Sequence, residues 1–296
     1  MPSASPPTPR NVHEQTVRHF GEEWSIFSQE RGWEREDGLS KMFDAYFAAL
    51  PDGALNASVV AGDFGAGSGR WASLLAPRVK RLYVLEPSTV AMGVARRNLA
   101  EFTNITFIEE PIGGPSSPAG SLDLAYSLGV IHHMPDSLQA LKDIRATLKP
   151  GGFFVGYLYY ALENRPRWYR AVWRSSDLMR ARISRLPIAR RRFATDVLAG
   201  LVYWPLARIA RLLARCGVDT AAIPLSAYSD KSFYVMRNDA LDRFGTPLEK
   251  RFTREELRAL LMAAGYDVKT LVFSPNPPYW CLSVRNVGAP TSVTPK

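Results

Sequence analysis

Cysteine is scarce in this chain. Cys216 and Cys281 are its two cysteines among 296 residues, which excludes a disulfide framework and a cysteine-rich zinc site. We therefore expect a cytoplasmic protein with no metal site. The first ten residues are rich in proline and serine and lack an apolar core segment, so they do not form a secretory signal. We expect residues 1–15 to be a disordered tail.

Long hydrophobic runs are missing as well. The apolar run Val197 to Ala207 has eleven residues and contains Pro205, so it is too short to span a bilayer. The Gly-Lys-Ser/Thr signature of a phosphate-binding P-loop is also absent. With 46% hydrophobic residues, the chain can form one sizeable core, or a core with a smaller appended unit.

The most informative stretch that is present runs from Val59 to Arg70. Its sequence, VVAGDFGAGSGR, predicts a buried strand, a glycine-rich turn and the start of a helix. Glycines at alternate positions remove the Cβ atoms from the turn, so a ligand could approach the main-chain N–H groups. A second apolar strand, 81–85, is followed by Glu86. An acidic residue about 20 residues after such a turn binds ribose hydroxyls in doubly wound folds.

Four motifs in order resemble class I S-adenosylmethionine (SAM)-dependent methyltransferases of the small-molecule type. Asp63–Gly69 resembles the first motif of that family, and Val84–Ser88 resembles the second. Residues 121–136 are similar to the fourth strand and its following loop, and Leu148–Tyr157 is similar to the turn into the fifth strand. The resemblance covers residues 57–160 and implies SAM as the cofactor. The residues that it assigns to cofactor binding are Asp63, Gly65, Ala66, Gly67, Gly69, Glu86, Pro87, Ser127 and Leu128.

The expected fold is α/β: a doubly wound, Rossmann-like, seven-stranded sheet whose last strand is antiparallel. We assign residues 57–160 and 251–290 to this SAM-binding core, 16–56 to an N-terminal helical cover, and 161–250 to a helical insertion. Apolar residues 138–148 at helical spacing predict a helix that Pro150-Gly151-Gly152 closes. Residues 253–256 form a capping box, and strands follow at about 267–273 and 279–285.

Two places depart from common family patterns. Many relatives have an acidic residue after the third strand that meets the adenine, but here the aligned position is Pro111 or Ile112. Asn276-Pro277-Pro278-Tyr279 spells the signature of amino-methylating enzymes, yet it lies between the last two strands instead of after the fourth. We interpret it as ordinary turn chemistry.

The candidate catalytic residues are His132 and His133, which follow the fourth strand. Either could take a proton from an acceptor, although relatives often keep a histidine here that only packs beside the cofactor. Tyr157 and Tyr159 follow the fifth strand and are expected to line the acceptor pocket. Trp24, in the aromatic N-terminal segment, could cover the pocket or anchor a helix.

The insertion is chemically unlike the rest of the chain. Between Ala161 and Cys216 it has thirteen arginines, no lysine and three acids, a net charge of +10 against +9 for the whole chain. This pattern is typical of a helical lid with a solvated basic face. It could also attract an anionic small molecule or make peripheral contact with a membrane surface. Nucleic acid is disfavoured, because the charge is confined to one insertion and no recognised binding module is present.

We therefore predict a SAM-dependent methyltransferase that acts on an oxygen or nitrogen of a small, anionic metabolite. A lipid or quinone methyltransferase at a membrane surface is the alternative with the same fold. A non-catalytic protein that keeps the cofactor fold for regulation or RNA interaction is the alternative from a different class. The oligomeric state is left open.

Overall fold

The computed structural model describes residues 11–28, 38–163, 165–220, 223–274 and 280–287. Residues 1–10 of the expected tail and the Asn276-Pro277-Pro278-Tyr279 motif lie outside these ranges. The chain divides into two compact units. The sheet unit comprises Met1–Val17, Ser28–Ala161 and Leu248–Lys296, and the helical unit comprises Arg18–Phe27 and Leu162–Pro247. Helix α1 (Glu14–Ile26) contains the boundary between them.

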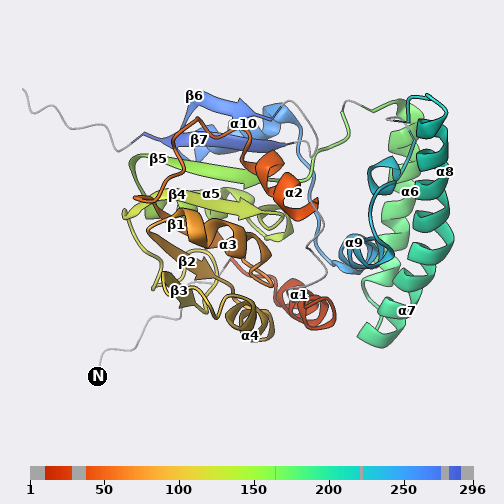
Figure 1. Ribbon diagram of the computed structural model, residues 1–296, viewed down its shortest axis with the longest axis horizontal. Helices are drawn as coiled ribbons and strands as arrows, with labels where there is room; N and C mark the ends of the chain where they lie inside the picture. Colours follow the sequence, from red (N-terminus) through yellow and green to blue (C-terminus); the bar gives the residue numbers. More distant parts are fainter. Residues whose placement is uncertain (1–10, 29–37, 164, 221–222, 275–279, 288–296) are drawn as a thin grey trace, which may run out of the picture. The chain divides into compact units, whose positions relative to one another are not determined.

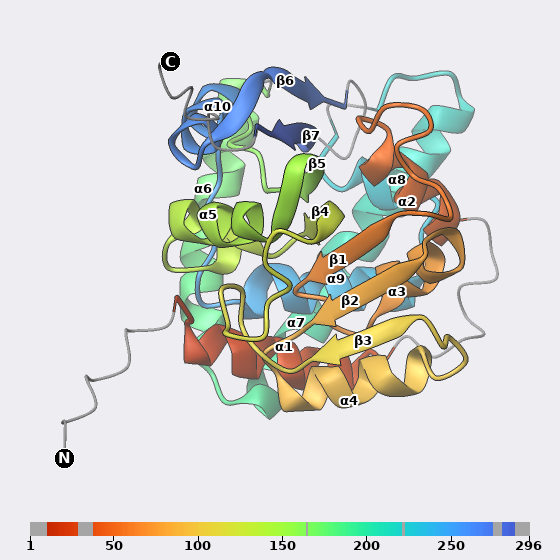
Figure 2. The same cartoon turned by 90° about the vertical axis from the view of Figure 1, so that its left-hand side faces the viewer.

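The sheet unit is built on a seven-stranded sheet with the order β3-β2-β1-β4-β5-β7-β6 (Figure 1, Figure 2). The first five strands pair in parallel, whereas β7 is antiparallel to both β5 and β6. This confirms the predicted doubly wound sheet with an antiparallel end. The strands are β1 (Val60–Phe64), β2 (Arg81–Leu85), β3 (Ile105–Ile108), β4 (Leu122–Leu128), β5 (Leu148–Tyr157), β6 (Tyr266–Phe273) and β7 (Cys281–Asn286).

Helices cover both faces of this sheet. One apolar cluster joins the sheet to α5 (Ser137–Thr147) and α10 (Arg254–Ala263), and includes Leu122 and Ala125 of β4. The other joins it to α2 (Gly38–Phe47), α3 (Arg70–Leu75) and α4 (Thr89–Asn98), and includes Leu124 and Tyr126. From Leu124 to Tyr126, after an irregularity in register between Leu122 and Leu124, successive side chains of β4 enter opposite cores, as expected of a strand buried on both faces.

Local signals set the ends of two helices. The Asp136 side chain accepts a hydrogen bond from the Gln139 amide at 2.9 Å, so α5 begins there. The predicted capping box is confirmed, because Thr253 and Glu256 satisfy each other's amides at the start of α10. The sequence prediction placed Leu148 in the helix, but it begins β5. Leu148 therefore adds to the apolar cluster from a strand and not from the helix.

The helical unit has its own small core. Besides the α1 residues Arg18–Phe27, it contains α6 (Arg167–Ile183), α7 (Ile188–Leu198), the π-helical turn η3 (Ala199–Tyr203), α8 (Trp204–Arg215), the short η4 (Ser226–Tyr228) and α9 (Phe233–Gly245). The buried residues that pack together are Ile183, Ala199, Tyr203, Ala207, Met236, Ala240 and Phe244. The segment predicted as a helical insertion is therefore helical and buries a cluster of its own.

Helices α7, η3 and α8 join into one 28-residue helix, Ile188–Arg215. Proline in a helix interior ordinarily clashes with the carbonyl four residues earlier. Here the wider π turn comes just before Pro205, and such turns relax the hydrogen-bond ladder. By length and composition this helix could cross a membrane. An 18-residue window within it has a mean hydropathy of 1.4, and 22% of that window is buried. The apolar run of eleven residues is therefore shorter than the continuous helix that contains it.

Candidate functional site

The predicted site residues of the sheet unit gather where β1, β2, β4 and β5 end. Asp63 lies one residue before the end of β1 and pairs in register with Val84 of β2 and Tyr126 of β4. Glu86 follows the last residue of β2. In open α/β sheets, this carboxyl edge, at the switch in strand order between β1 and β4, is where ligands bind.

The glycine turn has the conformation that its sequence predicts. Gly65, Gly67 and Gly69 have φ angles of 86°, 56° and 79°, a region that favours glycine. A Cβ on Gly65 would lie 2.6 Å from a Val130 methyl group, and one on Gly69 would lie 2.8 Å from Leu99. At these two positions the missing side chain therefore makes room for the protein's own packing.

The turn amides are engaged within the protein. Gly65 and Ala66 both donate to the Leu85 carbonyl, at 2.9 and 3.0 Å, and Gly69 donates to the Ala66 carbonyl at 2.9 Å. Gly67 donates to Oε2 of Glu86 at 3.0 Å. From the sequence, these amides were expected to face a ligand. Instead, three of the four hold the turn against the end of β2 and the Gly69 amide closes the turn on itself, so they shape the site more than they line it.

Glu86 links the two motifs. It is buried, and its other oxygen accepts from the Ser88 amide at 2.9 Å. Burial raises the pKa of Glu86 to about 6, while the amides of Ser88 and Gly67 lower it. The carboxylate thus joins the end of the second strand to the glycine turn. It belongs to the residue that the resemblance assigns to the ribose of the cofactor.

Asp63 carries a buried carboxylate oxygen that accepts no hydrogen bond of ordinary geometry from the described residues. Its side chain is 2% exposed. Burial raises the pKa of Asp63 to about 8, the Tyr126 hydroxyl lowers it, and Glu86 raises it further. A positively charged ligand group would relieve this cost. The residues therefore fit a cofactor that carries an ammonium and a sulfonium.

The remaining predicted cofactor residues surround the same edge. The Ser127 hydroxyl donates to the Phe64 carbonyl at 2.9 Å and ties the end of β4 to β1. Leu128 pairs with Tyr157 across β4 and β5. Pro87 is half-buried beside Glu86. At the position where relatives have an acidic residue that meets the adenine, Ile112 packs in the apolar core. The nearby Glu110 accepts hydrogen bonds from Ser116.

The two histidines form a buried pair in the short helix η2 (Ile131–His133). Nδ1 of His133 lies 2.6 Å from the Leu248 carbonyl, so this nitrogen carries the proton. The His132 ring stacks on Tyr159, with centroids 3.8 Å apart. Burial lowers the pKa of His132 well below its ordinary value, and His133 and Arg251 lower it further. His132 is therefore a neutral imidazole at pH 7, and the described residues give neither of its nitrogens a hydrogen bond.

Aromatic rings extend this cluster along the end of β5. Tyr157 lies 5.8 Å from Tyr159 and 5.0 Å from Tyr46, measured between ring centroids. The Arg251 guanidinium sits 5.0 Å from the centroid of the Tyr159 ring and is 2.9 Å from the Glu249 carboxylate. The sequence reasoning identified Tyr157 and Tyr159 but missed Tyr46, Glu249 and Arg251.

No local motif marks these missed residues. Residues 248–252 return from the insertion and form hydrogen bonds with the histidine loop and the end of β5. Lys250 donates to the His132 carbonyl at 2.9 Å, and Phe252 donates to the Tyr159 carbonyl at 2.9 Å. In the sequence, the signal available for residues 248–252 was that they immediately precede the capping box at Thr253. Trp24 belongs to the helical unit, and its role at the acceptor pocket stays a prediction.

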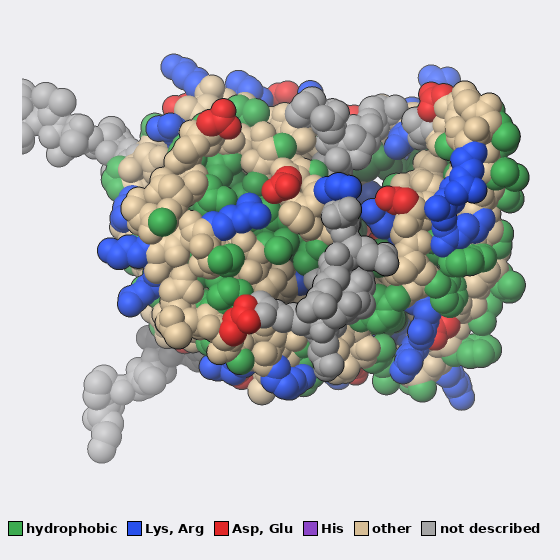
Figure 3. Space-filling view, viewed as in Figure 1, with side chains coloured by type: hydrophobic (Ala, Val, Ile, Leu, Met, Phe, Trp, Pro, Cys, Tyr) green, Lys and Arg blue, Asp and Glu red, His purple; other side chains and the backbone are tan. Residues whose placement is uncertain are grey.

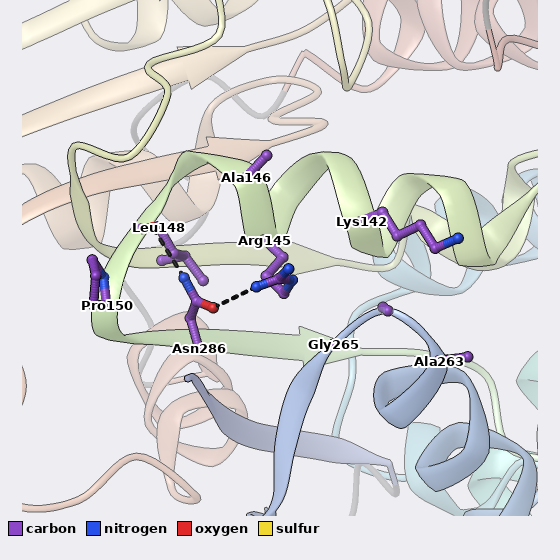
Figure 4. Close-up of a pocket in the computed structure, with 9 residues that line it drawn as sticks. Lys142, Arg145, Ala146, Leu148, Pro150, Ala263, Gly265 and Asn286 are labelled. Atoms are coloured by element: carbon purple, nitrogen blue, oxygen red, sulfur yellow. Dashed lines mark hydrogen bonds between the residues drawn. The ribbon is translucent and has the colours of Figure 1, made fainter. Parts of the chain in front are cut away.

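A hollow of about 550 Å³ lies at the other edge of the sheet (Figure 4). Lys142 and Arg145 of α5, Gly265 after α10, and Asn286 of β7 line it. Asn286 accepts from Arg145 at 2.9 Å and donates to the Leu148 carbonyl at 3.0 Å. Leu148 begins β5 whereas Tyr157 ends it, so the strand, of roughly 30 Å, separates this hollow from the site.

Comparisons with known proteins agree with this arrangement. Residues 62–156 match the family model of a methyltransferase domain. A Haloferax volcanii protein assigned as a methyltransferase, solved with the Trm112 methyltransferase activator, shares 14% identity over 91% of this chain and 98% of its own, with a TM-score of 0.50. A SAM-dependent methyltransferase from Thermotoga maritima shares 16% identity over 85% of this chain and 81% of its own, with a TM-score of 0.44.

A Bacillus halodurans protein assigned as a methyltransferase shares 17% identity over 48% of this chain, with a TM-score of 0.40, and the chain spans 59% of its length. No curated protein matches the chain. The matched segment is that of a methyltransferase domain, and the sheet order is that of the Rossmann-like methyltransferase fold. The small-molecule type that the motifs suggested stays a prediction.

Proposed function

We propose that this chain transfers the methyl group of SAM to an oxygen or nitrogen atom of a small, anionic metabolite. The observation that carries the proposal is the convergence of Asp63, Glu86 and the His132–His133 pair. All four are buried side chains that follow, or lie next to, the ends of adjacent parallel strands. Buried ionisable groups gathered at such an edge are typical of binding and catalytic sites.

The cofactor would be held by two carboxylates with different tasks. Asp63 offers its unshared buried oxygen to a cationic group, and Glu86 offers an acceptor at the end of β2. When bound, SAM supplies an electrophilic methyl group, so the protein's own task is alignment and exclusion of water. The remaining residues proposed for this role are Gly65, Ala66, Gly67, Gly69, Pro87, Ser127 and Leu128.

His132 is one of the two candidates for the proton acceptor. It is neutral, because burial lowers its pKa well below the ordinary value, and a neutral imidazole can accept a proton. His133 is the other: its Nδ1 donates to the Leu248 carbonyl, which places the lone pair of this imidazole on Nε2. Tyr159 stacks on His132 and would orient its ring, and Tyr157 would border the acceptor.

An anionic acceptor is supported by charge. The stretch from Ala161 to Cys216 carries a net charge of +10, and fields of this kind raise the local concentration of anions. In the sheet unit, Arg251 places a guanidinium beside Tyr159. The membrane-surface alternative is supported by a separate observation, the exposed apolar side chains of the helical unit.

Two measurements test this function in sequence. Calorimetry with SAM and with its demethylated product should show binding, and Asp63→Asn should weaken it. Asp123→Asn is the matched control, since Asp123 lies near the opposite end of β4 and pairs with Lys149 at 2.7 Å. Labelled SAM should then transfer its methyl group into the small-molecule fraction of an extract. If the chain binds SAM but labels no fraction, the enzymatic proposal fails and a non-catalytic role replaces it.

A further inference from the structure

The helical unit exposes large apolar side chains. Along helix Ile188–Arg215, five of the seven exposed ones recur every three, four or eight residues, a spacing that places these five on one side of the helix, and Val202 and Ile209 lie outside this series. We define the outer stripe as Phe193, Val197, Leu201, Trp204 and Leu212, which are 72%, 39%, 74%, 40% and 63% exposed. A contiguous apolar stripe of this kind marks an interaction surface in a folded protein.

Helix α6 repeats the pattern. Trp168, Val172 and Met179 are exposed and spaced by four and seven residues, so they also share one side of their helix. The opposite side of helix Ile188–Arg215 is occupied, because Ala199, Tyr203 and Ala207 pack in the core of the unit. The outer stripe is thus a second apolar face on a helix whose first apolar face is already buried.

The charge of these helices has one sign at the surface. Their two acids are engaged: Asp177 with Arg180 at 2.6 Å, and Asp196 with Arg237 at 2.8 Å. The exposed arginines from α6 to α8 are Arg167, Arg174, Arg182, Arg185, Arg190, Arg192, Arg211 and Arg215. Figure 3 shows basic and hydrophobic side chains intermixed along this part of the molecule. The surface therefore combines apolar side chains with uncompensated positive charge.

We propose that the outer stripe lies on an anionic lipid bilayer, with its apolar side chains at the boundary of headgroups and acyl chains. The flanking arginines then lie at the level of the lipid phosphates. Basic helices with Trp, Phe and Leu on one face bind in this way, and arginine side chains reach from an apolar stripe to the headgroups. Arg208 packs 4.0 Å from the Trp204 ring centroid and already has this dual environment.

Charge and chemistry favour this occupant over others. A second copy of the chain would bring two arginine-rich faces together, which costs energy unless acids intervene. Nucleic acid would satisfy the arginines but would leave leucines such as Leu201 and Leu212 without an apolar partner. A bilayer with anionic lipids satisfies both kinds of side chain.

The helix lies on the bilayer and does not cross it. Its length, 28 residues, corresponds to roughly 42 Å, which is enough to span. However, crossing would remove Tyr203 and Ala207 from their core and would place the Asp196–Arg237 pair in hydrocarbon. Charged side chains at that depth cost several kcal/mol. Lying flat keeps the core and the ion pair intact.

Co-sedimentation of the full chain with vesicles tests the proposal. Vesicles of phosphatidylcholine mixed with phosphatidylglycerol should bind the protein, and added salt should weaken the binding. Vesicles of phosphatidylcholine alone should bind it far less. An alkaline carbonate wash should release the bound protein, and retention through that wash would overturn the flat orientation.

Single substitutions locate the contact. Leu201→Ser and Phe193→Ser should each weaken vesicle binding about tenfold, as expected for a buried large apolar side chain. Arg211→Gln and Arg215→Gln should each weaken it about fivefold. Met262→Ser and Arg258→Gln are matched controls on α10 of the sheet unit, where Met262 is 63% exposed and Arg258 is exposed, and both should bind like the unaltered chain.

Each of the following results would also overturn the proposal. The unaltered chain could stay in solution with anionic vesicles. Phe193→Ser and Leu201→Ser could bind as tightly as Met262→Ser. Sedimentation velocity could reveal a dimer that Leu201→Ser dissociates, while the chain does not bind vesicles. The chain could also bind RNA and not vesicles. Cofactor calorimetry on each variant shows that the fold persists, so failure here is distinguishable from failure of the methyltransferase function.

Discussion

The two units of this molecule differ in which side chains depart from their ordinary place: the sheet unit buries charged ones, and the helical unit exposes large apolar ones. The sheet unit buries carboxylates such as Asp63 and Glu86, which ordinarily lie at the surface. The helical unit exposes Phe193 and Leu201, which ordinarily lie inside. Each departure carries a stability cost that a ligand can repay. In the sheet unit the ligand that we propose is a small cationic cofactor, and in the helical unit it is an extended anionic surface.

The largest expected effect separates chemistry from binding within the sheet unit. His132→Gln removes the neutral imidazole and should lower kcat about a thousandfold, because general-base catalysis supplies factors of this order. Cofactor affinity should change little. Steady-state kinetics and calorimetry on the same preparation measure both quantities. An unchanged kcat would mean that the ring only packs against Tyr159.

His132 also sets the expected pH dependence. Burial lowers the pKa of His132 well below its ordinary value, so the ring stays unprotonated across the neutral range. The kcat profile should therefore be level near neutrality and fall only in acid. A fall centred near the ordinary histidine pKa, about 6.5, would contradict this assignment.

Glu86 should have the next largest effect. Glu86→Ala removes the acceptor of the Gly67 and Ser88 amides together with the proposed ribose ligand. The dissociation constant for SAM should rise about a hundredfold, as expected for loss of buried, charge-assisted hydrogen bonds. Glu110→Ala is the control, since Glu110 accepts hydrogen bonds from Ser116 in the loop after β3. Calorimetry that finds equal affinities for the two variants would refute the role of Glu86.

Salt should act on the helical unit more than on the cofactor site. If the +10 stretch between Ala161 and Cys216 draws in an anionic acceptor, kcat/KM should fall about tenfold from low to high ionic strength. The SAM dissociation constant should vary less with salt, because the carboxylates of Asp63 and Glu86 are buried. A kcat/KM value that is independent of salt would indicate that the basic charge has no part in acceptor capture.

The smallest effect concerns stability. The pKa of Asp63 is about 8 in the folded protein and 3.8 in its ordinary state. The folded protein therefore holds this proton more tightly, and the stabilisation is present at low pH and lost as pH rises to about 8. Asp63→Asn should leave the Tm unchanged near pH 4 and raise it by roughly 5 °C at pH 8. Thermal unfolding across this range, without cofactor, measures the difference. A constant difference would mean that the carboxyl ionises normally.

Much of the sheet unit could be predicted because its signals are local. The glycine turn, the capping box at Thr253 and the strand pattern each depend on a few neighbouring residues. The partners of those residues could not be predicted. Whether the amide of Gly67 meets a ligand or Glu86 depends on how β2 ends beside the turn, and that is a tertiary contact.

The helical unit shows the complementary limit. Its basic, aromatic composition left open a solvated lid, an anionic small molecule or a membrane surface. Its apolar run by itself is too short to span a bilayer, whereas the π turn before Pro205 belongs to a continuous helix of 28 residues. The return of the chain at Glu249 and Arg251, far in sequence from Tyr159, follows from the length and folding of the whole insertion. No periodicity near residue 250 encodes that contact.

The hydrogen bond from His133 to the Leu248 carbonyl has an evolutionary consequence. The acceptor is a main-chain oxygen, and every amino acid supplies that oxygen. Residue 248 can therefore change freely while the tautomer of the ring is preserved. Genetic variation at this position would be silent for the imidazole, and a comparison of residue types across homologues would overlook the group that orients it.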